Sequence, residues 1–483
     1  MPPWLNRWLP LLLLTLAAFA CRSRDLAARP MHADEANQAV KAGELLESGR
    51  YVFDPQDHHG PVLYYAVLPV AWLRGQHTLA ALDETTVRLV PALAGAVGVF
   101  LLGVLAFPLG RWPALAAAAF LAVSPPAVYY SRYFIQETLL ATFALAALVA
   151  AQRWAATGRT RWALAAGVAA GLMQATKAST PFLLAAALLA WLAVRSRETP
   201  VRFAWRDGLL AALAAGVTTA LFYSSFGTNP AGVGEAVRTY GPLATRLSSG
   251  STGHEKPWWY FLQLLTGQRS GGLVFEQLAF FALAVIGMLV ALTGRTIFLS
   301  WAAGFTALVL IGLSLPSYKT PWHVIHLVPG CALLAAGALG ALGRVRHGRA
   351  LAGAITTVVL GCLLFQTDRV TRAYAADPRN PYAYVHSSPD VRKFRPLAEA
   401  GRAAAPGQPI RVISEEYWPL PWYFRGLTGV GYWSAVPDDC DGACVVASAG
   451  LANTVRARLH GAYDEAFLGL RPGFVCVVFT RRP

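Results

Sequence analysis

Long apolar runs alternate with short polar segments along most of the chain. Residues 87–107, VRLVPALAGAVGVFLLGVLAF, carry a single charge near one edge. A run of roughly 20 apolar residues can span the hydrocarbon core of a bilayer. A shorter, proline-containing run at 61–74 is predicted to lie along the membrane surface. The pattern predicts about eleven transmembrane helices, at 4–20, 87–107, 112–128, 137–154, 161–176, 180–195, 207–224, 273–293, 296–315, 321–342 and 350–366.

The C-terminal end has a different pattern, in which short strand-like runs alternate with helical ones. The predicted strands are 410–414, 430–434, 444–448 and 474–480, with a helix at 453–459. The expected fold class is therefore an all-α polytopic membrane protein with a small C-terminal α/β soluble domain. We place the transmembrane domain at 1–366, with an outer loop at 21–86, and the soluble domain at 367–483.

Composition and charge support a membrane protein. Hydrophobic residues make up 55% of the chain and charged residues 14%, whereas an average soluble protein carries roughly 25% charged residues. The net charge is +15, but the arginines sit in short loops between apolar runs, as at 153–161 and 195–206. Cytoplasmic loops are rich in Lys and Arg, so this distribution indicates membrane topology, and no nucleic-acid partner is expected.

The arginine count predicts a multi-pass protein of the cytoplasmic membrane. The N-terminus would be cytoplasmic and the C-terminal domain extracytoplasmic. Arg22, Arg24 and Arg29 disagree, because this topology places them outside. Residues 4–20 can therefore be read as a retained helix or as a cleaved signal peptide, which would leave the orientation of the other spans unchanged.

Two adjacent carboxylates, Asp34 and Glu35, follow the first apolar run in the segment HADE. A carboxylate fixed at the mouth of a membrane cavity can take the proton of an attacking hydroxyl. The structural alternative is that Asp34 caps the helix that begins after it.

Three histidines, His32, His58 and His59, lie in the same outer loop. With the neighbouring carboxylates they could hold a divalent metal, although their spacing fits no compact metal motif. The alternative is that they are ordinary polar loop residues. No other cofactor is indicated.

Further charged and polar groups sit at the predicted outer ends of later spans. They include Arg132 and Glu137 in SRYFIQETLL, Lys177 between two apolar runs, and Lys319 and His323 in SYKTPWH. A desolvated cation at a membrane boundary favours an anion such as phosphate. A lysine at a span end can also simply extend its ammonium to the interface.

HADE and SRYFIQETLL resemble segments of the GT-C membrane glycosyltransferases, among them the dolichyl-phosphate-mannose protein mannosyltransferases. The resemblance implies that Asp34 is the catalytic carboxylate, whereas Glu137 stands where that family has Asp. Further segments, SYKTPWH, NPYAYVHSSPDV and EEYWPLPWYFRGLTGVGYW, resemble the prokaryotic flippase activity-associated membrane proteins.

The sequence and this resemblance together favour an inverting glycosyltransferase. It would move a sugar from a polyprenyl-phosphate donor to a glycan, lipid or protein acceptor at the outer membrane face. Asp34 would be the general base, with Glu35 and Glu137 orienting the acceptor or a partner cation. His58, His59 and His323 would line the sugar cavity. Binding of the donor phosphate is assigned to Lys319, Arg132 and Lys177.

The main alternative is a non-enzymatic transporter of lipid-linked sugars or a flippase accessory protein, which needs no general base. A polysaccharide polymerase or ligase is a third reading. Whichever holds, Asp34, Glu137 and Lys319 are expected to share one outward-facing cavity.

Three cysteines, Cys440, Cys444 and Cys476, fall in the C-terminal domain. Disulfides persist outside the cytosol, so Cys476 is expected to pair with one of the other two. Such a bridge requires Cα atoms roughly 4.4–6.8 Å apart.

Overall fold

The structure is a computed structural model that describes residues 3–56, 59–197, 204–248, 253–294 and 296–483. The chain forms two compact units. Their boundaries divide the outer loop predicted at 21–86 between the two units, whereas the division predicted at 366 stays a prediction. Unit 1 contains Met1–Arg24, Arg50–Ala66 and Arg88–Tyr374, and unit 2 contains Asp25–Gly49, Val67–Val87 and Ala375–Pro483.

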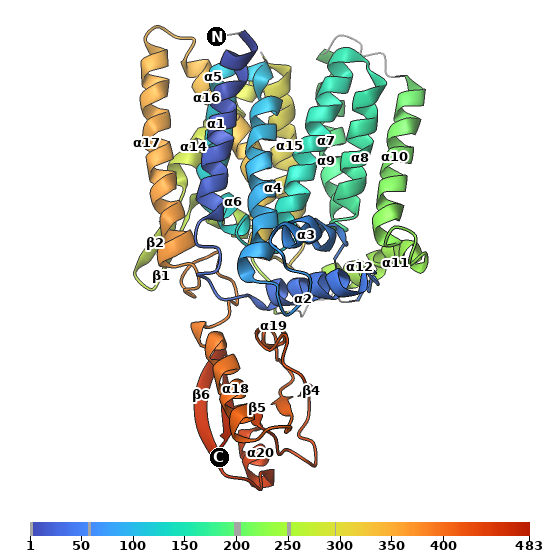
Figure 1. The fold of residues 1–483 in the computed structure, drawn as a ribbon. Coiled ribbons are helices and arrows are strands. Elements are labelled where there is room, and N and C mark those ends of the chain that lie inside the picture. The colour runs from blue at the N-terminus through green and yellow to red at the C-terminus, as the bar shows by residue number, and fades with distance from the viewer. Residues whose placement is uncertain (1–2, 57–58, 198–203, 249–252, 295) are drawn as a thin grey trace. The chain divides into compact units, whose positions relative to one another are not determined.

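Unit 1 consists mainly of helices, of which α7, α8, α9 and α10 lie side by side (Figure 1). Helices α3 (Val62–Leu73) and α4 (Glu84–Leu105) each have residues in both units. The other helices of unit 1 are α1 (Pro3–Ser23), α5 (Arg111–Val123), α6 (Pro125–Tyr130), α7 (Glu137–Thr157), α8 (Thr160–Gln174), α9 (Thr180–Val194), α10 (Trp205–Tyr223), α11 (Ala231–Arg238), α12 (Tyr240–Ser248), α13 (Tyr260–Thr266), α14 (Leu278–Leu292), α15 (Ile297–Ser314), α16 (Val328–Leu342) and α17 (Gly348–Asp368).

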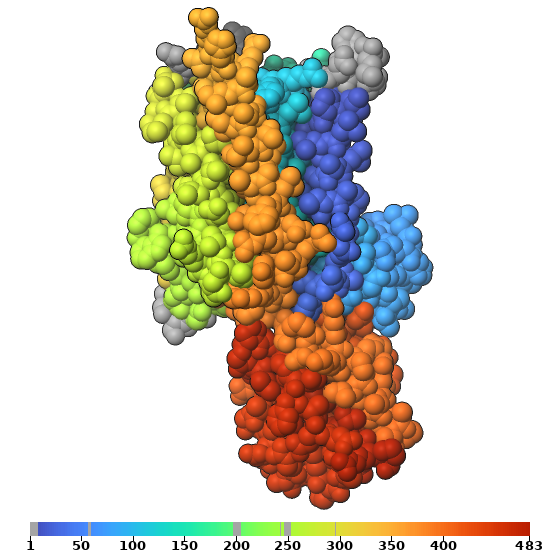
Figure 2. All heavy atoms as spheres, turned by 90° about the vertical axis from the view of Figure 1, so that its left-hand side faces the viewer, coloured from blue at the N-terminus to red at the C-terminus, as the bar shows by residue number. Residues whose placement is uncertain are grey.

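The helices of unit 1 have the length and composition of a multi-pass membrane protein. Five helical segments within the described residues are long and apolar enough to cross a bilayer: Glu84–Leu105, Glu137–Thr157, Ile297–Ser314, Pro321–Leu342 and Gly348–Ala373. Helix α17, which lies beside α14 (Figure 2), exposes large apolar side chains such as Val358 and Phe365. Exposed apolar side chains on a long helix are what a lipid environment accommodates.

Each of the eleven predicted spans overlaps a helix, although the number that cross the membrane stays a prediction. The predicted span 112–128 is broken in the structure, because α5 ends at Val123 and α6 begins at Pro125. Proline disfavours the helical conformation of the residue before it, and Ser124 is indeed extended (ψ 127°). The predicted span 273–293 loses its first residues to a hairpin of β1 (Gly267–Ser270) and β2 (Leu273–Glu276).

Small residues allow close approach of neighbouring helices in unit 1. A Cβ added at Gly167 on α8 would lie 2.2 Å from the Ala211 carbonyl oxygen on α10. One added at Gly287 on α14 would lie 1.9 Å from the Leu334 oxygen on α16. Small residues at such contacts let helices in membranes pack backbone against backbone, which is how helices without a hydrophobic driving force associate.

Unit 2 contains helix α2 (Ala33–Ser48) and a five-stranded sheet of order β4-β3-β5-β7-β6. Strand β3 is parallel to β4 and β5, whereas β7 is antiparallel to β5 and β6. The predicted strands and helix of this domain are confirmed, and β6, α18 and α19 are additional. The elements are α18 (Phe394–Ala404), β3 (Ile410–Ile413), α19 (Leu420–Tyr423), β4 (Val430–Trp433), β5 (Cys444–Ser448), α20 (Ala452–Arg458), β6 (Tyr463–Arg471) and β7 (Phe474–Arg481).

The predicted disulfide is wrong, because Cys440, Cys444 and Cys476 are buried free thiols. On the paired strands Cys476 lies opposite Ser448, four residues from Cys444. Four residues of strand cover roughly 13 Å, beyond the reach of a disulfide. Cys440 belongs to the apolar core and directs its Sγ to the Pro437 carbonyl oxygen at 3.2 Å. These cysteines therefore act as small core residues.

Candidate functional site

The HADE segment opens helix α2 with a capping box. His32 is the N-cap, and its Nδ1 accepts a hydrogen bond from the Asp34 N–H at 3.0 Å. The His32 N–H donates to Glu35 Oε2 at 3.2 Å. These two hydrogen bonds give partners to the backbone N–H groups of His32 and Asp34, which the start of a helix would otherwise leave unpaired.

Glu35 has a structural role at the start of α2. Its side chain is 0% exposed, and its Oε1 lies 3.0 Å from Arg29 Nη2 in a buried ion pair. With Oε2 bound to the backbone of His32, both carboxylate oxygens are occupied. Glu35 therefore holds the start of α2, and its full burial keeps an acceptor away from it.

Asp34 is placed differently from its neighbour. Its side chain is 50% exposed, and Oδ2 lies 3.9 Å from His32 Nδ1. The helix cap is His32, so the capping role considered for Asp34 does not apply. Its carboxylate is at the second position of the helix, where the partial positive charge of the N-terminus stabilises an anion. Asp34 is thus an accessible carboxylate in the first turn of α2.

The histidine that supports Asp34 is neutral. Burial lowers the pKa of His32. The charge of Arg29 lowers this pKa further, whereas the carboxylates of Asp34 and Glu35 act in the opposite direction. Because Nδ1 accepts the Asp34 N–H, the ring proton belongs on Nε2. The His386 ring lies 5.8 Å away, and burial lowers its pKa as well.

A second cluster, in unit 1, brings together Glu137, Lys177 and His323. Glu137 is in the first turn of α7, and Lys177 is in the turn between α8 and α9, where their side chains form an ion pair. Lys177 Nζ lies 3.3 Å from His323 Nε2, which is 4.0 Å from Glu137 Oε1. His323 Nδ1 lies 3.3 Å from Thr320 Oγ1. The sequence separates these residues widely, and the fold brings them together.

The Lys177 turn is held against the outer loop. The Gly60 N–H donates to the Thr176 carbonyl at 3.2 Å, and the Val62 N–H to the Ala175 carbonyl at 3.1 Å. A Cβ at Gly60 would lie 2.2 Å from the Ala175 oxygen, so this contact requires glycine. His59 directly precedes that glycine. His58 lies outside the described residues.

Arg132 and Lys319 both donate to backbone carbonyls. Arg132 Nη1 donates to the carbonyls of Arg22 at 3.1 Å, Cys21 at 3.4 Å and Arg24, at the C-terminal end of α1. A cation at this position satisfies carbonyls that the helix leaves unpaired.

Lys319 is buried, and its Nζ donates to the Lys256 carbonyl at 3.1 Å and to that of Pro316. Burial lowers the pKa of this ammonium. Backbone hydrogen bonds also join the two loops, from the Lys256 N–H to the Ser317 carbonyl and from the Lys319 N–H to the His254 carbonyl, both at 3.0 Å. Lys319 thus ties two loops together.

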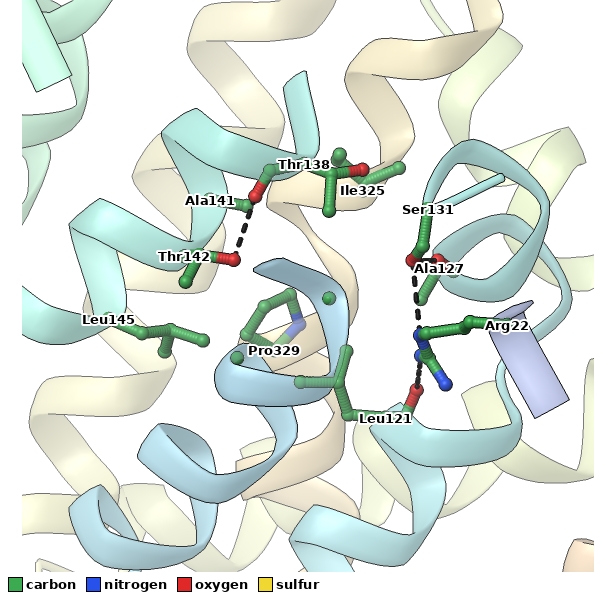
Figure 3. Close-up of a pocket in the computed structure, with 12 residues that line it drawn as sticks. Arg22, Leu121, Ala127, Ser131, Thr138, Ala141, Thr142, Leu145, Ile325 and Pro329 are labelled. Carbon is green, nitrogen blue, oxygen red and sulfur yellow. Dashed lines mark hydrogen bonds between the residues drawn. The ribbon is translucent and has the colours of Figure 1, made fainter. Parts of the chain in front are cut away.

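Arg22 is a buried cation that the sequence interpretation did not assign to the site. Its side chain is 1% exposed, and it donates to the carbonyls of Ala122 at 2.7 Å and Leu121 at 3.0 Å and to Ser131 Oγ at 3.1 Å. It lines a pocket of about 30 Å³ with Thr138 (Figure 3). This space holds one or two waters and no sugar ring.

The buried arginines also bear on the topology disagreement noted above. Arg22 is buried among backbone carbonyls, and Arg29 is buried in its ion pair with Glu35. The positive-inside rule concerns Lys and Arg in loops that face solvent near the membrane. Arg22 and Arg29 therefore carry no such information, whereas Arg24 is exposed and still disagrees with the predicted topology. In the sequence, the burial of Arg22 was indicated by its position just after the apolar run 4–20.

Metal ligands do not gather in the described part of the chain. No group of three or more His, Cys, Asp or Glu residues lies there at distances suited to a metal ion. The expected cavity of Asp34, Glu137 and Lys319 concerns residues of both units and stays a prediction.

Comparison with known proteins agrees with the resemblance seen in the sequence. The family model for dolichyl-phosphate-mannose-protein mannosyltransferase matches residues 59–222. None of the curated protein sequences matches the chain.

Solved structures of membrane glycosyltransferases share the fold. ArnT from Cupriavidus metallidurans bound to undecaprenyl phosphate matches with a TM-score of 0.65 and 17% identity over 97% of both chains. The oligosaccharyltransferase of Archaeoglobus fulgidus, tethered to an acceptor peptide, matches with a TM-score of 0.60 and 13% identity over 96% of this chain and 73% of its own. The mycobacterial arabinofuranosyltransferase AftD matches at 0.54 and 15% identity, over 100% of this chain and 40% of its own. The chain therefore has the fold of the GT-C glycosyltransferases, as the sequence predicted.

Proposed function

We propose that this chain is a membrane glycosyltransferase that moves a sugar from a polyprenyl-phosphate donor to an acceptor hydroxyl, with inversion. The observation that carries the proposal is the difference between two neighbouring carboxylates. Glu35 is fully buried and paired, whereas Asp34 is half-exposed on the same rigid helix start. A flippase accessory protein that forms no new bond to a hydroxyl needs no general base.

In the proposed reaction Asp34 acts as general base. The acceptor hydroxyl gives its proton to the Asp34 carboxylate as its oxygen forms a bond to the anomeric carbon. The bond from that carbon to the phosphate oxygen breaks, and the polyprenyl phosphate leaves with the electron pair. Attack from the side opposite the phosphate inverts the anomeric centre.

Among the three cations expected to bind the donor phosphate, we assign this role first to Lys177. Its side chain is 11% exposed and lies beside His323, whose side chain is 21% exposed. Glu137 fixes the ammonium, so the cation is held in place before a phosphate arrives. Arg132 and Lys319, whose donors go to backbone carbonyls, hold the surrounding loops in this account.

The proposed reaction takes place at the outer face of the cytoplasmic membrane. The N-terminus would be cytoplasmic and the C-terminal domain extracytoplasmic. The donor is a polyprenyl-phosphate-linked sugar, and the acceptor is a hydroxyl of a glycan, lipid or protein. The fold shared with ArnT bound to undecaprenyl phosphate supports a lipid-linked donor.

The proposal is tested by mass spectrometry of surface glycans and glycoproteins in a deletion strain. Complementation with the wild-type gene should restore the missing sugar, and complementation with Asp34→Asn should not. If Asp34→Asn restores it in full, the transporter interpretation is correct and the transferase interpretation is wrong. Immunoblotting of both forms in the membrane fraction controls for expression.

A further inference from the structure

The segment that carries Asp34 belongs to the same compact unit as the C-terminal domain. Asp25–Gly49, which includes α2, is grouped with Ala375–Pro483 although some 330 residues separate them in sequence. Helix α2 packs directly against α19 of the C-terminal domain.

Three contacts fix the residues just before Asp34. The Met31 N–H donates to Tyr423 Oη at 3.0 Å. Arg392 Nη2 donates to the carbonyls of Ala27 at 2.6 Å and Ala28 at 2.8 Å. The His386 ring packs edge-on against the His32 ring. All three partners come from the C-terminal domain, and all three act within seven residues of Asp34.

The far end of α2 is held through an intermediate segment. The Leu79 N–H donates to Glu47 Oε1 at 2.7 Å, and Leu79 also packs against α2 where a Cβ at Gly43 would clash. This segment is itself attached to the C-terminal domain. Arg425 Nε donates to the Leu82 carbonyl at 2.9 Å, and Trp422 Nε1 donates to Glu84 Oε1 at 2.8 Å.

The helix is therefore held at both ends by residues of the same compact unit. Catalysis by a positioned group depends steeply on geometry, and a displacement of about 1 Å can lower a rate 100-fold. Precise sites need neighbouring residues that lock the orientation of the reacting group.

We infer that the C-terminal domain positions the general base, with Tyr423 and Arg392 as positioning residues that act through the HADE segment. This inference rests on the proposed function, in which Asp34 takes the acceptor proton. It gives the C-terminal domain a part in the chemical step although it contributes no reacting group.

The first test measures the attachment itself. Hydrogen–deuterium exchange of the backbone amides 31–36 is recorded for the full-length protein in lipid nanodiscs. Tyr423→Phe and Arg392→Gln should each speed exchange there about three- to tenfold, because each removes hydrogen bonds that hold the segment.

Matched controls are Tyr463→Phe and Arg456→Gln, whose hydrogen bonds stay within the sheet region of the same domain. These controls should leave exchange at 31–36 unchanged. Wild-type exchange in both positioning variants would overturn the inference.

The second test links the attachment to the reaction through the transfer rate of the purified full-length protein in nanodiscs, where the residual rate of Asp34→Asn can be followed. Arg392→Gln should lower the rate, and Arg392→Gln combined with Asp34→Asn should be no slower than Asp34→Asn alone. An additional loss in the double variant would show that Arg392 acts independently of Asp34 and would overturn the inference. If Asp34→Asn alone retains the full rate, the proposed function fails, and the exchange result still decides whether the domain holds the segment.

Discussion

Arg29 Nη2 lies 3.0 Å from Glu35 Oε1 in a buried ion pair, whereas Asp34, the preceding residue in sequence, has a half-exposed carboxylate. The ion pair distinguishes Glu35, which it holds in the interior, from its neighbour Asp34. Glu35 holds the start of the helix, whereas the carboxylate of Asp34 is half-exposed. Substitutions at the two positions should therefore fail in different ways.

Glu35→Gln should destabilise the protein. It removes the charge that neutralises buried Arg29, and breaking a buried pair from one side costs about 3–5 kcal/mol. The midpoint of thermal unfolding in detergent measures the effect. Glu44→Gln is the matched control, because Glu44 is on the same helix in an exposed pair with Lys41. Equal unfolding midpoints for both variants would contradict the structural role of Glu35.

The pair of Glu137 and Lys177 should behave as a coupled unit. Glu137→Gln leaves a buried ammonium without its carboxylate and should reduce stability by about 3–5 kcal/mol. Adding Lys177→Met should recover most of that loss, because the uncompensated charge is gone. Thermal unfolding of the single and double variants measures the coupling. If the double variant is less stable than the single one, the two side chains do not depend on each other.

Stability should depend on pH through His32 and His386. Burial lowers both pKa values in the folded protein, so below about pH 6.5 the unfolded chain binds protons that the folded one does not. The free energy of unfolding should therefore fall as the pH drops from about 6.5 toward the folded-state values, by at most about 2.7 kcal/mol per pH unit for two sites.

The measurement for this pH dependence is the unfolding midpoint at pH 7.5 and pH 5.5. His386→Gln should reduce the difference between the two values. His460→Gln, at an exposed position, should leave it unchanged. An unaltered pH dependence in His386→Gln would show that this histidine does not contribute.

The buried thiols predict a distinct labelling pattern. Burial raises the pKa of Cys444 and Cys476 to about 12, which disfavours the reactive thiolate. Iodoacetamide should modify these two residues only after denaturation. No reductant should be needed for that modification, because the thiols are free. Peptide mass spectrometry identifies the labelled sites. A linked pair of cysteine peptides in the unreduced protein would contradict the free thiols.

Much of the fold could be predicted because its signals are local. Apolar runs located the long helices of unit 1, and short strand-like runs located four strands of the C-terminal sheet. Strand β6 was missed because it is an edge strand, with Asp464 and Glu465 exposed in its first half. Its pattern lacks the continuous apolar run that marks a buried strand.

The candidate site was only partly predictable. Asp34, Glu137 and Lys177 were proposed as site residues from their chemistry and their place beside apolar runs, and these roles stay predictions. Sequence could not show that Glu137 and Lys177 pair with each other, because 40 residues separate them. Nor could it show that Arg132 and Lys319 donate to backbone carbonyls, since such partners leave no pattern in side-chain types. The difference between Asp34 and Glu35 likewise depends on the hydrogen bond from the His32 N–H to the Glu35 carboxylate, which the sequence does not reveal.

The central claim is that Asp34 removes the acceptor proton in a sugar transfer. The most direct measurement is the transfer rate of the purified full-length protein in nanodiscs, with lipid-linked sugars extracted from its host as donor. Asp34→Asn should lower kcat by about 10²–10⁴ while the unfolding midpoint stays within error, because general-base catalysis contributes that much. Asp34→Glu should retain more activity than Asp34→Asn, since it keeps a carboxylate. A wild-type rate for Asp34→Asn would contradict the account.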